Sequence, residues 1–202
     1  MLTKWFLLGV LVLVPTAVMA AGDAESGKTL AAPCGACHGQ NGVAMVPGAP
    51  NLAGQNARYL KTQLEMIKSG VRPVALMAGQ LDALSSKNLE DLAAYFSAMS
   101  PTVGQASGDL VAMGEQIYRG GIAQKSVPAC TACHTPTGSG NAPAGFPYIG
   151  GQRADYVIVQ LVAYREGTRQ TDDGYGAAMR QVANGLTDRE INALASYIQG
   201  LH

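Results

Sequence analysis

Apolar residues recur along this chain at intervals of three and four positions, in stretches separated by Gly and Pro. This spacing predicts amphipathic helices, and no stretch alternates between apolar and polar residues as a half-buried strand would. We expect first helices at residues 23–32 and 109–119 and a middle helix at 56–69. A last helix opens with a capping box at 187–190, which has a weaker counterpart at 85–88. The pattern therefore predicts an all-α protein.

The second half of the chain repeats the first. Residues 50–55, Pro-Asn-Leu-Ala-Gly-Gln, correspond to 147–152, Pro-Tyr-Ile-Gly-Gly-Gln, and the same offset of 97 positions relates Tyr59/Tyr156, Gln63/Gln160, Leu64/Leu161, Gly70/Gly167 and Arg72/Arg169. Beyond Arg169 the offset becomes 102, because the second copy has gained five residues within 170–175. Such repetition predicts two domains of similar fold.

The repeat also suggests where each domain begins and ends. We expect an N-terminal domain at 21–102, a short polar linker at 103–108 and a C-terminal domain at 109–202. A domain of about 80 to 100 residues has a marginal hydrophobic core when it folds alone. A large apolar cofactor buried in each domain would add the missing apolar centre.

The four cysteines lie in two five-residue motifs, Cys34-Gly35-Ala36-Cys37-His38 and Cys130-Thr131-Ala132-Cys133-His134. The pattern Cys-x-x-Cys-His is typical of covalent haem c attachment, in which both thiols form thioethers and the histidine binds iron. A redox-active dithiol, a structural disulfide and a four-cysteine zinc site are the alternatives, and none explains a histidine directly after each pair. We therefore predict two covalently bound haem c groups.

Each haem iron needs a second axial ligand. The chain has three histidines, and the third, His202, is its last residue, so two bis-histidine haems are excluded by count. Methionine is the usual alternative in electron-transfer haems. Met179 is the only methionine after His134, and subtraction of the local offset of 102 selects Met77. We expect both in the loop before the last helix, in preference to three other methionines of the first copy, Met45, Met66 and Met99.

Other residues of the repeat are candidates for supporting the haems. An iron-bound histidine usually donates its second ring N–H to an acceptor. The carbonyl groups of Pro50 and Pro147 are our first candidates for that acceptor, and those of Pro47 and Pro143 are alternatives. Arg72 and Arg169 could pair with haem propionates, or could be solvated side chains after a helix C-terminus.

Charge and the N-terminal segment bear on location and partners. The chain has 14 basic and 14 acidic residues and no basic cluster, so we expect no nucleic-acid partner. Residues 1–20 combine Lys4, an apolar run at 5–14 and Val18-Met19-Ala20, which is typical of a cleaved secretory signal peptide. We therefore expect a periplasmic protein without an integral membrane span. An N-terminal anchor that is not cleaved is the alternative.

The mature chain resembles the dihaem cytochrome c4 family, in which two class I cytochrome c domains stand in tandem. The resemblance rests on the two haem motifs, on residues 50–64 and on the pairing of Leu89–Tyr95 with Ile191–Tyr197. It implies His/Met ligation of both haems, a pseudo-two-fold arrangement that brings the haems close together, and periplasmic electron transfer. The second copy departs from the first in its Gly150-Gly151 pair and in its longer 170–175 segment.

These observations predict an electron carrier and not an enzyme. Its partners would be redox proteins such as a membrane-bound oxidase or a quinol-oxidising complex, and peripheral membrane association stays open. A cytochrome subunit of a dehydrogenase or oxidase complex would use the same sites with a different partner. A dihaem peroxidase would need one haem with an open position, and such enzymes are longer than this chain.

Overall fold

The computed structural model describes residues 22–202, and these residues are helical with two isolated β-bridges, Ile122 with Val127 and Asn141 with Phe146. The predicted signal segment at 1–20 lies outside the described residues. The helices of the first half are α1 (Ala24–Leu30), η1 (Ala32–Cys34), α2 (Gly35–His38), α3 (Ala57–Lys68), η2 (Ala75–Met77) and α4 (Ser86–Ser97). Those of the second half are α5 (Val111–Gly120), η3 (Ala123–Lys125), α6 (Thr131–His134), α7 (Ala154–Arg165), η4 (Asp173–Tyr175), α8 (Ala178–Asn184) and α9 (Asp188–Gly200). The predicted all-α class is confirmed.

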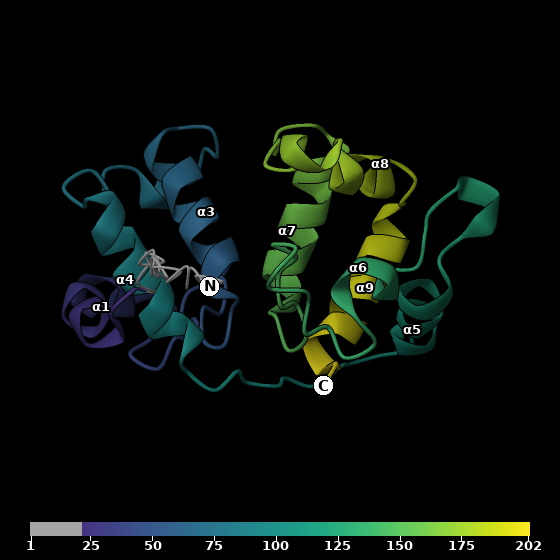
Figure 1. Cartoon of the computed structure of the whole chain (residues 1–202). Coiled ribbons are helices and arrows are strands. Elements are labelled where there is room, and N and C mark those ends of the chain that lie inside the picture. Colours follow the sequence, from purple (N-terminus) through teal and green to yellow (C-terminus); the bar gives the residue numbers. More distant parts are fainter. Residues whose placement is uncertain (1–21) are drawn as a thin grey trace, which may run out of the picture.

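The helices form two tandem domains that lie side by side, with α3 of one facing α7 of the other (Figure 1). Within the first domain α4 packs against α1 and α3, and within the second α9 packs against α5 and α7. Each domain therefore repeats the same arrangement, a last helix in contact with the first and middle helices. Within the described part of the chain, no helix is long and apolar enough to span a membrane.

Glycine allows the first and last helices of each domain to cross closely. A Cβ added to Gly27 of α1 would lie 2.0 Å from the Asp91 carbonyl oxygen of α4, and one added to Gly114 of α5 would lie 2.2 Å from that of Ala193 in α9. Real Cβ atoms do not approach backbone oxygens so closely, so only glycine fits at the two crossings. The periodicity of apolar residues did not predict this role.

Each domain has its own apolar core. The core of the second domain is the larger one and contains the buried residues Ile117, Tyr118, Val127, Val157, Leu186, Ile191, Leu194, Ala195, Tyr197, Ile198 and Leu201. The first domain buries a smaller set, namely Ala31, Leu60, Leu81, Leu89, Leu92, Ala93 and Phe96. Since buried apolar area is the main favourable term in folding, the first domain depends more on any additional apolar group that it encloses.

Helix ends follow the capping residues. Thr187 and Glu190 exchange hydrogen bonds at the start of α9, and Ser85 and Asn88 form the same reciprocal capping box at the start of α4. The counterpart that looked weaker in sequence is thus complete in the structure, because an asparagine amide can replace the glutamate carboxylate as acceptor.

The structure corrects one local prediction. Met179 was expected in a loop, and instead it lies in the first turn of α8, a helix of seven residues. The residue before this helix is Ala177, which has a left-handed conformation and no polar side-chain atom that could cap the helix. A short helix without a local start signal cannot be recognised from periodicity, because its first turn is held by more distant groups.

The polar segment between the domains is attached to the last helix. Gly104 donates its backbone N–H to the Gln199 carbonyl at 3.0 Å, and the Gln199 side chain donates to the Gln105 carbonyl at 2.9 Å. Ser107 and Ser196 exchange two further hydrogen bonds. These bonds hold the segment between the domains against α9.

Candidate haem sites

The two Cys-x-x-Cys-His motifs form α2 and α6, which are single helical turns after the first helix of each domain. The second cysteine of each motif is exposed and the first is partly buried, whereas His38 and His134 are each only 8% exposed. Each turn ends at its histidine, because Gly39 and Thr135 have a positive φ and redirect the chain. Both motifs therefore present one exposed thiol and one partly buried thiol, with the imidazole toward the interior.

Each buried histidine has a backbone acceptor. His38 Nδ1 lies 2.9 Å from the Pro50 carbonyl oxygen, and His134 Nδ1 lies 3.2 Å from that of Pro147. Since a carbonyl oxygen only accepts, Nδ1 carries the proton and the lone pair of Nε2 is free for a metal. Burial lowers the pKa of both imidazoles, more than the carbonyl contact raises it, so both stay neutral near pH 7.

The competing uses of the cysteines have no support in the structure. Among residues 22–202 no group of three or more His, Cys, Asp or Glu side chains could hold a metal ion, so the two pairs do not form a shared zinc site. Burial also raises the pKa of the Cys34 thiol and raises that of Cys130 to about 11. A raised pKa disfavours the thiolate that a redox dithiol requires.

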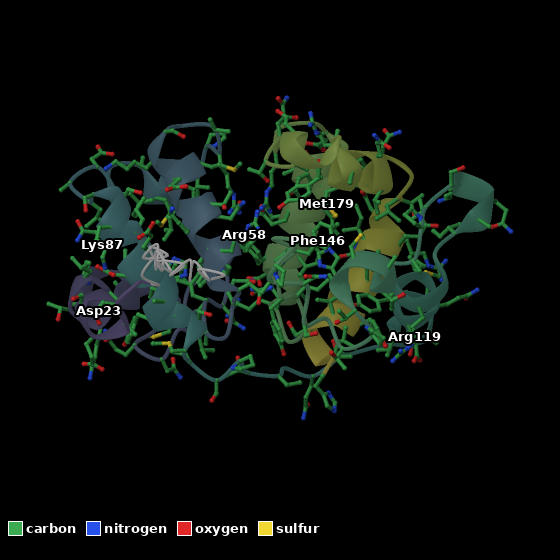
Figure 2. The ribbon with its side chains drawn as sticks, in the orientation of Figure 1. Asp23, Arg58, Lys87, Arg119, Phe146 and Met179 are labelled. Carbon is green, nitrogen blue, oxygen red and sulfur yellow. The ribbon has the colours of Figure 1, made fainter. Side chains whose placement is uncertain are left out.

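The candidate methionines differ in position. Met77 ends η2 and packs partly buried on the core of the first domain, and Met179 is partly buried in α8 (Figure 2). Of the alternatives, Met45 is 72% exposed, Met66 lies on α3 and Met99 packs against the core of the first domain. Met77 also lines a cavity of about 430 Å³, together with Arg72, Pro73, Val74 and Leu81 among others.

Arg72 and Arg169 lie at the boundary between the domains, where they are 8% and 6% exposed. The solvated alternative is therefore wrong for both. Arg72 of the first domain donates to Tyr156 Oη of the second at 2.8 Å. Arg169 of the second domain donates to Tyr59 Oη of the first at 2.9 Å. The two arginines, like the two tyrosines, are related by the sequence repeat, so the contact is pseudo-symmetric.

Two glutamine side chains join the arginines into one cluster. Gln63 Oε1 accepts from Arg72 Nη1 at 2.8 Å and from Arg169 Nη2 at 2.9 Å. Gln160 Oε1 accepts from Arg169 Nη1 at 2.7 Å and from Arg72 Nη2 at 3.1 Å. Each amide oxygen thus binds one arginine of its own domain and one of the other. The sequence signal for this cluster is the recurrence of Gln63 as Gln160 at the constant offset of 97 positions, which by itself indicates no role.

The arginine cluster lacks a negative charge. Among the described residues, no ion pair involves Arg72 or Arg169, and buried charges are costly unless they are paired. Arg169 Nε donates to Thr171 Oγ1 at 3.0 Å, whereas Arg72 Nε is buried without a partner among the described residues. A haem carries two propionates, and these anions fit both the missing charge and the free N–H beside the cavity.

A second set of pseudo-symmetric bonds extends the interface. Gln55 donates to the Tyr148 carbonyl and accepts from its N–H, both at 2.8 Å. Gln152 makes the same pair with Asn51, at 3.0 and 2.9 Å. Arg58 adds a bond from the first domain to the Pro143 carbonyl (Figure 2). The two domains are therefore joined mainly by polar side chains that recur in the repeat.

Comparison with known proteins agrees with this geometry. The cytochrome c family model matches the chain twice, at residues 24–100 and 111–202. Cytochrome c4 of Pseudomonas aeruginosa is 51% identical over 183 residues, which are 91% of this chain and 90% of that protein. The chain belongs to the cytochrome c4 family.

Solved structures of the cytochrome c4 family agree as well. The crystal structure of reduced cytochrome c4 from Pseudomonas stutzeri is 50% identical and superposes with a TM-score of 0.87, over 90% of this chain and 100% of that one. The "thiosulfate dehydrogenase electron acceptor" of Stutzerimonas stutzeri is more distant, at 36% identity over 81% of this chain and 76% of that protein. The resemblance and the two tandem cytochrome c domains are therefore confirmed.

Membership of the cytochrome c4 family establishes the cofactor and the general activity. The chain is a dihaem electron-transfer cytochrome with two covalently bound haem c groups, and the presence of two Cys-x-x-Cys-His motifs is consistent with this number. The predicted cofactors are thus confirmed.

Loss of one glutamine at the cytochrome c4 domain interface should destabilise the protein. In Gln63→Ala, the two arginine N–H groups that Gln63 binds lose their acceptor while they stay buried. We expect a loss of about 2–3 kcal/mol in the free energy of unfolding, measured by chemical denaturation of the haem-loaded protein. Gln80→Ala is the matched control, since Gln80 is exposed, and it should change stability by less than about 0.5 kcal/mol. Equal effects of the two variants would contradict the role of the cluster.

Acid should weaken a second contact of the interface. Asp155 accepts from Gly48 N of the other domain at 2.9 Å, and its hydrogen bonds with Arg153 are the main cause that lowers its pKa from 3.8 to about 2. A lowered folded-state pKa stabilises the protein above about pH 4, and this contribution is lost as the pH falls toward 2. Urea midpoints between about pH 5 and 2 should therefore fall more steeply for the wild type than for Asp155→Asn. Asp82→Asn, at an exposed position, should keep the wild-type slope.

Proposed function

We propose that this protein carries single electrons in the periplasm, between a respiratory donor such as a quinol-oxidising complex and a terminal oxidase or another acceptor. The family supports the electron-transfer activity, and the signal-like segment at 1–20 supports export. In this proposal the mature protein consists of domains at 21–102 and 109–202 with the linker at 103–108.

In the proposed sites, His38 and Met77 bind one iron, and His134 and Met179 bind the other. Cys34 and Cys37, like Cys130 and Cys133, hold the two haems through thioethers. The observation that carries this assignment is the pair of buried imidazoles, each of which has Nδ1 at a proline carbonyl and Nε2 free. In each domain, one methionine stands at the position that the repeat relates to the other.

When bound, the haem supplies an iron that alternates between Fe(II) and Fe(III). His38 with Met77, and His134 with Met179, would hold each iron without leaving a position for substrate, so that its surroundings would change little between the two charges. The carbonyl groups of Pro50 and Pro147 orient the imidazoles. The arginine cluster offers positive charge to the propionates, and in our proposal the free Nε–H of Arg72 donates to one of them.

A spectrum of the oxidised protein tests this function. Two low-spin haems, both with the weak near-infrared band of thioether-to-iron charge transfer, are expected from two closed His/Met sites. A high-spin haem that binds peroxide would instead indicate a peroxidase with one open position. That result would contradict the carrier.

A cytochrome that serves one dehydrogenase is the second candidate. The similarity to the thiosulfate dehydrogenase electron acceptor of Stutzerimonas stutzeri favours it, because such a protein could use the same sites with a different donor. Gentle solubilisation of membranes followed by affinity purification separates the two. Stoichiometric co-purification with one dehydrogenase supports this candidate, and recovery of the free protein supports the carrier.

A further inference from the structure

The residues gained by the second domain support the methionine that follows them. Asp172 lies in the inserted segment and is only 3% exposed. Its Oδ1 accepts from Arg180 Nε at 2.8 Å, and its Oδ2 accepts from the backbone N–H of the same residue at 2.9 Å. Arg180 directly follows Met179 in the chain. One buried carboxylate thus holds both the backbone and the side chain next to the proposed iron ligand.

Other contacts of the inserted segment limit its movement. Tyr175 packs its ring on Phe146 with centroids 5.5 Å apart, and its hydroxyl donates to the Ala144 carbonyl at 2.9 Å. Ala177 donates its N–H to the Asp172 carbonyl at 3.1 Å, and Gln181 donates to the Gly176 carbonyl at 2.8 Å. Tyr175 therefore attaches the inserted segment to the loop at 144–146, and the other two bonds hold the first turn of α8 against that segment.

Among the described residues, the first domain has no buried carboxylate next to Met77, although Met77 itself packs on the core of that domain. Its segment does not contain the inserted residues, and Ala78 stands where the second copy has Arg180. Backbone bonds of a single 3₁₀ turn hold Met77, such as Met77 N to the Val74 carbonyl at 2.9 Å. Considering the described residues alone, no side chain between positions 73 and 82 makes a hydrogen bond or an ion pair, and Leu76 is 76% exposed. A segment with few buried contacts opens locally at low cost.

We propose that Asp172 is a positioning residue, which acts through Arg180 to keep Met179 on its iron, so that the two haems differ in how readily they exchange methionine. This inference rests on the axial ligation proposed above. When a ligand such as imidazole enters, its nitrogen forms a bond to iron while the iron–sulfur bond breaks, and no electron is gained or lost. Held by Asp172, Met179 stays close to the iron and rebinds, whereas Met77 moves away with its exposed turn.

The first part of the test compares the two sites. In Met77→His the near-infrared thioether band reports only Met179, and in Met179→His it reports only Met77. Imidazole is added to each oxidised, haem-loaded protein until the band is half lost. We expect that Met179 needs about 10-fold more imidazole than Met77, the lower end of the effect of residues that orient metal ligands. Equal midpoints would overturn the proposal.

The second part tests Asp172 itself in the Met77→His background. Asp172→Asn should lower the imidazole midpoint about 10-fold while the band without imidazole and the haem content stay unchanged. Asp173→Asn is the matched control, because Asp173 also contacts Arg180 but its side chain is 72% exposed, and it should leave the midpoint unchanged. If Asp172→Asn does not retain its haem, Arg180→Gln is used, which removes the side-chain contact alone. An unchanged midpoint would overturn the role of Asp172.

The two levels of proposal fail in different ways. If the wild type lacks the thioether band at either haem, the axial assignment is wrong, and this conclusion does not depend on the imidazole midpoints. If both bands are present and the midpoints are equal, the assignment stands and the role of Asp172 is wrong.

Discussion

Replacement of both Cys34 and Cys37 by alanine is expected to yield a protein with one covalent haem and a largely unfolded first domain. The thioethers cannot form, and without its haem the main apolar cluster of this domain has only seven buried residues among those described. A domain of this size is marginal without an added apolar centre. Haem content per chain, measured by absorbance against protein concentration, should fall to about half, and far-ultraviolet circular dichroism should show loss of helix.

The second domain offers the matched variant. Cys130→Ala with Cys133→Ala should also halve the haem content, but the main apolar cluster of its domain is larger, with eleven buried residues in the described part. We therefore expect less loss of helix than in the variant that lacks Cys34 and Cys37. Full haem content in either double variant would contradict the proposed attachment sites, and equal loss of helix would contradict the difference between the cores.

Met77→His and Met179→His should each lower the reduction potential of one haem. A thioether ligand raises the potential of a haem relative to a second imidazole. Axial ligation sets haem potentials over a range of about 0.8 V, so we expect a drop on the order of 0.1 V. Potentiometric titration should show one haem shifted and the other little changed, and half of the near-infrared thioether band should be lost.

Met66→His serves as the control for the axial assignment. Met66 lies on α3 and does not correspond to Met179 in the repeat, so this variant should keep both potentials and the whole band. If Met66→His removes half of the band and Met77→His does not, the assignment by repeat is wrong.

Sequence reasoning succeeded where a property is local or recurs. The capping box at Thr187 and the helix that stops before Gly70 are set by neighbours in the chain, and both appear in the structure. It failed at α8, because Asp172 holds the first turn of that helix from outside it. It also left open whether Arg72 and Arg169 are solvated, since a position after a helix end does not say what packs on it.

By itself, the sequence determined the chemistry of this protein and its duplication. The Cys-x-x-Cys-His motifs, the count of histidines and the constant offset depend only on residue types and spacing, and they sufficed to predict two haems in two similar helical domains. Only the tertiary structure decided how the domains meet. Arg72 and Arg169 find partners 84 to 110 positions away, in the other domain. Helical periodicity describes which face a helix buries within its own domain, whereas the acceptor of a buried charge depends on which surfaces the two domains bury against each other.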